Sequence, residues 1–250
     1  MSNKKVLVLG ASSGIGKSCV KRFAKEGWDV CLSARREELL HEIHSELPQG
    51  NHIVVPGSYE DPKTATNISN IISSRWHNLD AFINSAGVFM GADFLDSSLE
   101  DWRKPFDIMV NGAILCTRAA AELMSGGGRI IHITSIWGER VAGAAGAYAM
   151  AKAAINQFCR VMAFELAPRN ILVNAIAPGF VDTPMSIVEN TNELETDWFR
   201  QNYLEGWHLP LRRAALPEEI AGVAHFLAGP DASYITGQVL AVDGGLSITF

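Results

Sequence analysis

Short apolar runs alternate with longer helical segments along the whole chain, and this alternation constrains the fold more than any other feature. The runs are nearly continuous in apolar character, which is typical of parallel strands that are covered on both faces. We predict strands at Val6–Leu9, Val30–Ser33, His52–Val55, Ala81–Asn84, Arg129–Thr134, Leu172–Ala175 and Val239–Val242.

Helices are predicted between these strands, at Gly16–Lys25, Glu37–Glu46, Lys63–Arg75, Ile108–Met124, Ala147–Ala167 and Pro217–Leu227. A strand–helix–strand order with short connections is the pattern of α/β folds. No repeat or linker interrupts it. We therefore expect residues 1–250 to form a single domain: a doubly wound, Rossmann-type parallel sheet flanked by helices.

The composition excludes several classes of protein. The 250 residues are 48% hydrophobic and 19% charged, enough for one large core. The net charge of −6 argues against a nucleic-acid partner. We find no apolar run long enough to cross a membrane and no signal peptide. The cysteines stand singly and the histidines do not cluster, so we expect neither a disulfide framework nor a metal site. We expect a cytoplasmic protein.

One segment departs from this alternation, between Asp182 and Pro217. It lacks strand signals and carries acidic residues, including Glu189 and Glu193, together with several aromatic ones. Long insertions of this kind are often lids or binding loops. A pair of solvated surface helices is the alternative. Because the segment follows a strand near the expected ligand site, we favour a helical substrate lid over residues 185–215.

A glycine-rich turn follows the first strand directly, in Gly10-Ala-Ser-Ser-Gly14-Ile-Gly16. Glycines between a strand and a helix allow a tight turn and the close approach of a pyrophosphate to the helix N-terminus. The spacing differs from the commoner G-x-G-x-x-G pattern. Its place after the first strand nevertheless favours a dinucleotide site over a purely structural turn.

The residues after the second strand indicate which dinucleotide is bound. An acidic residue there would accept a hydrogen bond from the ribose 2′-hydroxyl, whereas an arginine suits a 2′-phosphate. The chain has Ala34, Arg35 and Arg36 at this point. Arg35 offers a forked donor to a phosphate group, so NADP (NADPH) is favoured. If the arginines only solvate the start of the next helix, NAD remains possible.

Tyr148 and Lys152 lie four residues apart in an alanine-rich helical stretch, which places them on one helix face. A tyrosine titrates near pH ~10, so proton transfer near neutrality calls for a lowered pKa, which a neighbouring ammonium supplies. Tyr59 and Lys63 share this spacing, but Pro62 interrupts their helix. Only the pair at 148 and 152 is a candidate.

Ser135 follows the strand Arg129–Thr134, where the carboxyl ends of parallel strands face a ligand crevice. Its hydroxyl is suited to bind a substrate oxygen while Tyr148 exchanges the proton. Thr134 is expected in the core. Asn111 stands among apolar residues of a predicted helix and needs a polar partner if it is buried.

These residues resemble the short-chain dehydrogenase/reductase family over essentially the whole chain, and most closely its 3-oxoacyl-carrier-protein reductase-like members. The resemblance rests on the order and spacing of the glycine turn, Asn84-Ser-Ala-Gly87, Asn111, Ser135, Tyr148-x-x-x-Lys152, Pro178-Gly-Phe-Val-Asp-Thr-Pro-Met185 and Tyr234-Ile-Thr-Gly-Gln-Val-Leu-Ala-Val-Asp-Gly-Gly245.

The resemblance implies a catalytic tetrad. Tyr148 is its acid and base, Lys152 lowers the pKa of Tyr148 and holds the nicotinamide ribose, Ser135 orients the carbonyl, and Asn111 holds a relay water. Ser135, Trp137 and Tyr148 are then the expected substrate contacts, although Trp137 equally suits packing beneath the lid. The expected cofactor contacts are Gly10, Ser12, Ser13, Gly14, Ile15, Gly16, Arg35, Asn84, Ala86, Gly87, Tyr148, Lys152, Pro178, Gly179, Val181 and Thr183.

The implied activity is NADP(H)-dependent hydride transfer between a ketone and a secondary alcohol, with no metal. An NAD-dependent alcohol, polyol or sugar dehydrogenase is the alternative, and a non-catalytic dinucleotide sensor or structural subunit is a further one. The chain has Ser13 and Ser58 where relatives often have a basic and an acidic residue. By analogy with the family, a homotetramer is expected.

Overall fold

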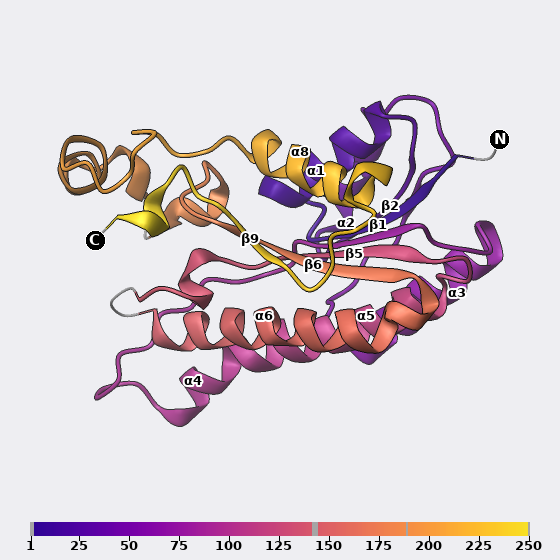
Figure 1. Cartoon of the computed structure of the whole chain (residues 1–250), viewed down its shortest axis with the longest axis horizontal. Helices are drawn as coiled ribbons and strands as arrows, with labels where there is room; N and C mark the ends of the chain where they lie inside the picture. Colours follow the sequence, from indigo (N-terminus) through magenta and orange to yellow (C-terminus); the bar gives the residue numbers. More distant parts are fainter. Residues whose placement is uncertain (1–2, 142–144, 189, 250) are drawn as a thin grey trace.

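A seven-stranded, wholly parallel sheet forms the centre of the molecule (Figure 1). The computed structural model describes residues 3–141, 145–188 and 190–249. The strand order is β3-β2-β1-β4-β5-β6-β9. The strands are β1 (Lys5–Leu9), β2 (Asp29–Ser33), β3 (Ile53–Val54), β4 (Ala81–Asn84), β5 (Gly128–Ile133), β6 (Ile171–Pro178) and β9 (Val239–Val242). Each predicted strand is present, and the doubly wound fold is confirmed.

Helices cover both faces of the sheet (Figure 1). One layer holds α1 (Gly14–Lys25), α2 (Glu37–Ser45) and α8 (Pro217–Ala228). The other holds α3 (Pro62–Arg75), α5 (Gly112–Glu122) and α6 (Gly146–Leu166). In the described part of the chain, no helix combines the length and the apolar character that crossing a membrane requires.

The pleat of β1 shows why its sequence is apolar without alternation. Val6 and Val8 point into the core beneath α1 and α8, whereas Leu7 and Leu9 point into the core beneath α3, α5 and α6. All four side chains are at most 1% exposed. Successive side chains of a strand face opposite ways, so a strand between two helix layers needs apolar side chains on both of its faces.

In the structure, the stretch predicted as one helix at Ile108–Met124 is divided into two helical segments of different type. A π-helical stretch, η1 (Phe106–Asn111), precedes α5, and a further helix that was not predicted, α4 (Leu99–Pro105), comes before it. Ser98 and Asp101 cap α4 in a reciprocal capping box. Pro105 ends it, because proline has no N–H to donate and its ring crowds the preceding turn. The wider turns of η1 follow directly.

The lid segment is more irregular than the expected helices. Its described residues form a small hairpin of β7 (Ile187–Val188) and β8 (Thr191–Asn192), a single turn α7 (Asp197–Phe199) and a π-helical stretch η6 (Arg200–Glu205). Phe199 and Tyr203 pack edge-on against Phe180, with ring centroids 4.9 and 4.7 Å away. This aromatic cluster anchors the segment beside β6. Glu189 lies outside the described residues.

Candidate active site

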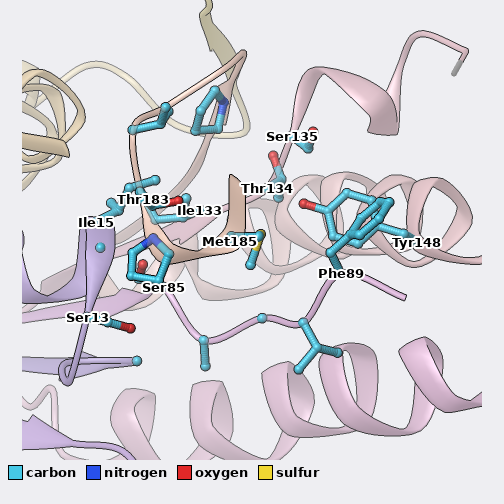
Figure 2. A pocket seen from close by; sticks show the side chains of 18 of the residues that line it. Ser13, Ile15, Ser85, Phe89, Ile133, Thr134, Ser135, Tyr148, Thr183 and Met185 are labelled. Atoms are coloured by element: carbon cyan, nitrogen blue, oxygen red, sulfur yellow. The ribbon is translucent and has the colours of Figure 1, made fainter. Parts of the chain in front are cut away.

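A cavity of about 310 Å³ opens at the carboxyl ends of β1, β4, β5 and β6. The chain leaves β1 toward one edge of the sheet, where β2 and β3 lie. It leaves β4 toward the other edge, where β5, β6 and β9 lie. Ligands of open α/β sheets bind at such a switch point. Figure 2 shows Ser13 and Ile15 on one side of this cavity and Ser135 and Tyr148 on the other.

The glycine turn is built by close backbone packing. Gly10 has φ +72°, and a Cβ on it would lie 2.6 Å from the carbonyl oxygen of Ser85. A Cβ on Gly16 would overlap the carbonyl oxygen of Gly10. Both positions therefore require glycine, and α1 begins beside the cavity wall. The unpaired N–H groups at its N-terminus fit an anionic pyrophosphate.

Most predicted cofactor contacts line the cavity. Those that do so are Gly10, Ser12, Ser13, Gly14, Ile15, Arg35, Ala86, Gly87, Tyr148, Lys152, Pro178, Gly179, Val181 and Thr183. Gly16 and Asn84 do not line it. Asn84 is 3% exposed and accepts a hydrogen bond from the N–H of Ala86 at 3.3 Å. Its place is behind the wall, where it orders the backbone that the cavity presents.

His132, on β5, completes the network behind that wall. Its Nδ1 lies 3.2 Å from Asn84 Nδ2, and its Nε2 lies 3.4 Å from the Thr117 hydroxyl. Burial, aided by the charge of Lys152, lowers the pKa of His132 to about 3. The ring is therefore neutral near pH 7, accepting from Asn84 at Nδ1 and donating to Thr117 from Nε2.

Both arginines after β2 line the cavity, but Arg36 makes contacts that sequence reasoning missed. Its Nη2 donates to the Ser12 hydroxyl at 3.0 Å and to the Ser13 hydroxyl at 2.9 Å. Arg36 thus bridges the end of β2 to the glycine turn. The two adjacent arginines in the sequence indicate a cationic site, but the rule for the residue after the second strand pointed only to Arg35.

A carboxylate also lies at this end of the cavity. Ser58 stands where relatives often have an acid, and its hydroxyl donates to Glu60 at 2.7 Å. Glu60 itself lines the cavity. Glu60, two residues further along the chain, therefore places an acidic side chain in the region where Ser58 provides none.

Tyr148, Lys152 and Ser135 converge at the opposite end. Tyr148 and Lys152 lie on one face of α6, with the Lys152 amine 5.5 Å from the centroid of the Tyr148 ring. Ser135 follows β5, and its hydroxyl accepts from the Trp137 N–H at 3.2 Å. The three groups line one continuous cavity, as the sequence predicted.

We expected the neighbouring Lys152 to lower the pKa of Tyr148, but in this structure that pKa is raised. Burial raises that pKa to about 12, and hydrogen bonding with Ser135 opposes the rise only in part. Burial also lowers the pKa of the Lys152 amine to about 8. Desolvation penalises the charged form of both groups. The phenol therefore keeps its proton at neutral pH and is ready to act as an acid.

The structure does not support the relay role expected of Asn111. Its side chain is exposed, donates to Asp107 at 3.3 Å and does not line the cavity. Met109 packs directly behind the cavity wall instead: it is fully buried, and its sulfur lies 3.7 Å from where a Cβ of Gly87 would stand. The Lys152 amine lies 3.4 Å from the same point. The π-helical stretch after Pro105 determines which side chains face inward here.

The substrate end has an aromatic wall. Trp137 lines the cavity, and its ring packs edge-on against Tyr148 at 6.0 Å between centroids. Phe89 packs against both rings, 5.9 Å from Trp137 and 5.4 Å from Tyr148. Met185 adds a flexible apolar side chain from the lid segment. Across residues 3–141, 145–188 and 190–249, no group of three or more His, Cys, Asp or Glu side chains is placed to hold a metal.

The parallel sheet with a cavity at its switch point is the arrangement found in α/β proteins that bind dinucleotides. A family model described as enoyl-(acyl carrier protein) reductase matches residues 10–247. The chain is 35% identical to a 3-oxoacyl-[acyl-carrier-protein] reductase of Synechocystis sp., covering 96% of this chain and 95% of the relative. It is 31% identical to meso-2,3-butanediol dehydrogenase of Serratia marcescens, covering 97% and 94%.

A solved structure agrees. L-sorbose reductase from Gluconobacter frateurii, complexed with NADPH and L-sorbose, superimposes with a TM-score of 0.90 at 31% identity, covering 100% of this chain and 98% of that one. The chain belongs to the short-chain dehydrogenase/reductase family, as its motifs predicted. It is an oxidoreductase related to enzymes that act on ketone and alcohol groups.

Proposed function

We propose that the protein is an NADP(H)-dependent oxidoreductase that interconverts a ketone and a secondary alcohol, with Tyr148 as acid and base. The observation that carries this proposal is the convergence of Tyr148, Ser135 and Lys152 in the cavity that also contains the glycine turn. A nicotinamide cofactor supplies or accepts a hydride when it is bound.

The roles of the side chains follow from their chemistry. Ser135 donates a hydrogen bond to the carbonyl oxygen and orients it. Tyr148, whose pKa burial raises to about 12, holds the proton that the oxygen receives on reduction. Lys152 places an ammonium beside the phenol, which favours the phenolate left after proton transfer. In the oxidative direction, Tyr148 takes the proton back.

The charge at the adenosine end supports NADP rather than NAD. Arg35 and Arg36 both line the cavity, and Arg36 already contacts the serines of the glycine turn. A 2′-phosphate suits two guanidinium groups, whereas Ala34 has no acceptor for a ribose hydroxyl. The NADPH in the L-sorbose reductase structure is consistent with this preference.

A binding titration with NADPH and NADH tests the cofactor. We expect NADPH to bind at least about tenfold more tightly, with the preference lost in an Arg35→Ala/Arg36→Ala double variant. The matched control is Arg118→Ala, because Arg118 is exposed on α5 and does not line the cavity. Equal affinities would instead favour the NAD-dependent alcohol, polyol or sugar dehydrogenase. Cofactor binding without turnover of any ketone or alcohol would favour a sensor or structural subunit.

We further propose that the chain forms a homotetramer. On α6, Met150, Val161 and Phe164 are 52%, 40% and 85% exposed, and Leu240 of the edge strand β9 is 42% exposed. Exposed apolar side chains on an outer helix suit burial against a second copy. Light scattering should show the tetramer, and Phe164→Glu should shift it to a smaller species.

We also propose that the protein functions in the cytoplasm. Cys19, Cys31, Cys116 and Cys159 are free and buried, and burial raises the pKa of each thiol. Unpaired thiols are usual in a reducing compartment. Fractionation of the native cells would test this location.

A further inference from the structure

The substrate end of the cavity is enclosed mainly by apolar side chains. Phe89 and Trp137 flank Tyr148, and Met185 and Val188 contribute from the lid segment. Phe89, Met185 and Val188 are 39%, 46% and 45% exposed, so they present free surface to a ligand. Figure 2 shows Phe89 beside the ring of Tyr148. An apolar group next to the reacting carbon would remove this surface from water.

Among the described residues of the lid segment, Glu193 is the one acidic residue that lines the cavity. Burial raises the pKa of its carboxyl, and its charge in turn helps to raise the pKa of Tyr203. Glu193 is therefore partly withdrawn from water and lies close to the aromatic cluster that anchors the segment. Because Glu193 lines the cavity, its negative charge acts on whatever the cavity binds.

Three cations occur among the described lining residues, and none of them belongs to the lid segment or to the aromatic wall. Arg35 and Arg36 follow β2 at the adenosine end. Lys152 lies beside Tyr148 at the substrate end, but the residue is only 4% exposed, and its amine donates to the carbonyl oxygen of Ile133 at 3.0 Å. None of the three belongs to the lid or to the aromatic wall, so neither surface offers a positive partner to a substrate anion.

The arginines of the lid segment already have partners. Arg200 pairs with Asp197 at 2.9 Å, and Arg213 pairs with Glu219 at 2.6 Å. Arg212 stacks on the ring of Trp207, 3.4 Å from its centroid. A carboxylate or phosphate on the substrate would meet Glu193 without a free guanidinium from this segment to offset the repulsion.

We propose that the site takes an uncharged ketone or secondary alcohol with an apolar substituent, and that Glu193 discriminates against substrates that carry a carboxylate or phosphate near the reacting carbon. This inference rests on the proposed function and names the substrate class of the same site. Shape is supplied by Phe89, Trp137 and Met185, and charge selection by Glu193.

The charge selection is tested with acetoacetate and acetoacetamide, which share a ketone and a size but differ in charge. With NADPH at neutral pH, we expect kcat/KM to be at least about tenfold higher for the amide. Glu193→Gln should raise the ratio of kcat/KM for acetoacetate to that for the amide about fivefold. Glu195→Gln is the matched control, because Glu195 is exposed two residues away and does not line the cavity.

The apolar wall is tested with 4-phenyl-2-butanone and L-sorbose. We expect the aryl ketone to be the better substrate, and Trp137→Ala to raise its KM about tenfold. Trp198→Ala should change it little, because Trp198 is 59% exposed and does not line the cavity.

The outcomes separate the two proposals. Equal turnover of acetoacetate and acetoacetamide that Glu193→Gln leaves unaltered would overturn the charge selection, and a preference for L-sorbose would overturn the apolar class. Both results would leave the ketone–alcohol activity intact. Failure of every ketone and alcohol to turn over while NADPH binds would overturn the proposed function and this inference with it.

Discussion

Lys152 donates a hydrogen bond from Nζ to the main-chain carbonyl oxygen of Ile133 over 3.0 Å. The bond joins the middle of α6 to the last residue of β5. Tyr148 lies one turn earlier on the same helix, and Ser135 lies two residues beyond Ile133. This buried contact therefore helps to hold the phenol and the serine hydroxyl in the same cavity.

Tyr148→Phe should lower kcat by about 10²–10⁴-fold, because it removes the proton donor and leaves the ring in place. NADPH affinity should stay within about twofold. Steady-state kinetics and a binding titration on the same preparation measure both. Tyr234→Phe is the matched control, since Tyr234 is fully exposed. Retention of most of the turnover would assign the proton to another group.

The pH dependence of reduction should report the Lys152 amine. Burial lowers its pKa from 10.5 to about 8, so the ammonium is lost as the pH rises through that value. We expect kcat/KM for ketone reduction to fall between pH 7 and pH 9. A pH–rate profile that stays flat through pH 9 would contradict the role of the ammonium.

The same shift makes a prediction about stability. Between about pH 8 and pH 10.5, the unfolded chain holds a proton on Lys152 that the folded chain lacks. The contribution of Lys152 to the unfolding free energy therefore rises with pH across this window. Urea unfolding should show a smaller rise for Lys152→Met than for the unaltered protein.

Asn111→Ala should change kcat by no more than about twofold, because the Asn111 side chain is exposed and bonds only to Asp107 among the described residues. Met109→Ala should instead destabilise the fold by about 2–5 kcal/mol through a buried cavity. Kinetics and urea unfolding of the two variants separate these effects. A large loss of turnover in Asn111→Ala would restore the relay role.

His132→Leu should cost about 1–3 kcal/mol at pH 7.5, because Asn84 Nδ2 and the Thr117 hydroxyl lose their partner. NADPH affinity should fall too, since Asn84 orders the N–H of Ala86. Burial lowers the pKa of His132 from 6.5 to about 3, so only the unfolded chain gains a proton between these values. His132 thus loses stabilising effect as the pH falls, and the cost of the substitution should be smaller at pH 5. His208→Leu, at an exposed position, is the control.

Gly10→Ala should abolish tight dinucleotide binding and destabilise the fold by more than about 1 kcal/mol. The new Cβ would lie 2.6 Å from the Ser85 carbonyl oxygen on a residue with φ +72°. Thermal unfolding and an NADPH titration measure both effects. Gly126→Ala is the matched control, because its Cβ would have no neighbour within 4 Å. Normal binding by Gly10→Ala would show that the turn tolerates a side chain.

Local patterns were sufficient to predict the sheet and the site elements next to it. Each strand of the parallel sheet is apolar on both faces, so its sequence identifies it without knowledge of its neighbours. The glycine turn is recognised from its own residues, although Gly16 is required by packing within the turn and Gly10 by packing against the distant Ser85. The spacing of Tyr148 and Lys152 depends only on the helix that carries them.

The sequence by itself therefore determined the fold class, the family and the residues that converge on the cavity from strand ends and from α6. Only the tertiary structure decided that Met109 rather than Asn111 packs beside Gly87 and Lys152, that Arg36 bridges to Ser12 and Ser13, and that Glu193 lines the cavity. The physical reason is the range of the interactions. Strand and helix periodicity is set within a few residues, whereas the wide turns after Pro105 and the course of the lid depend on packing against distant elements.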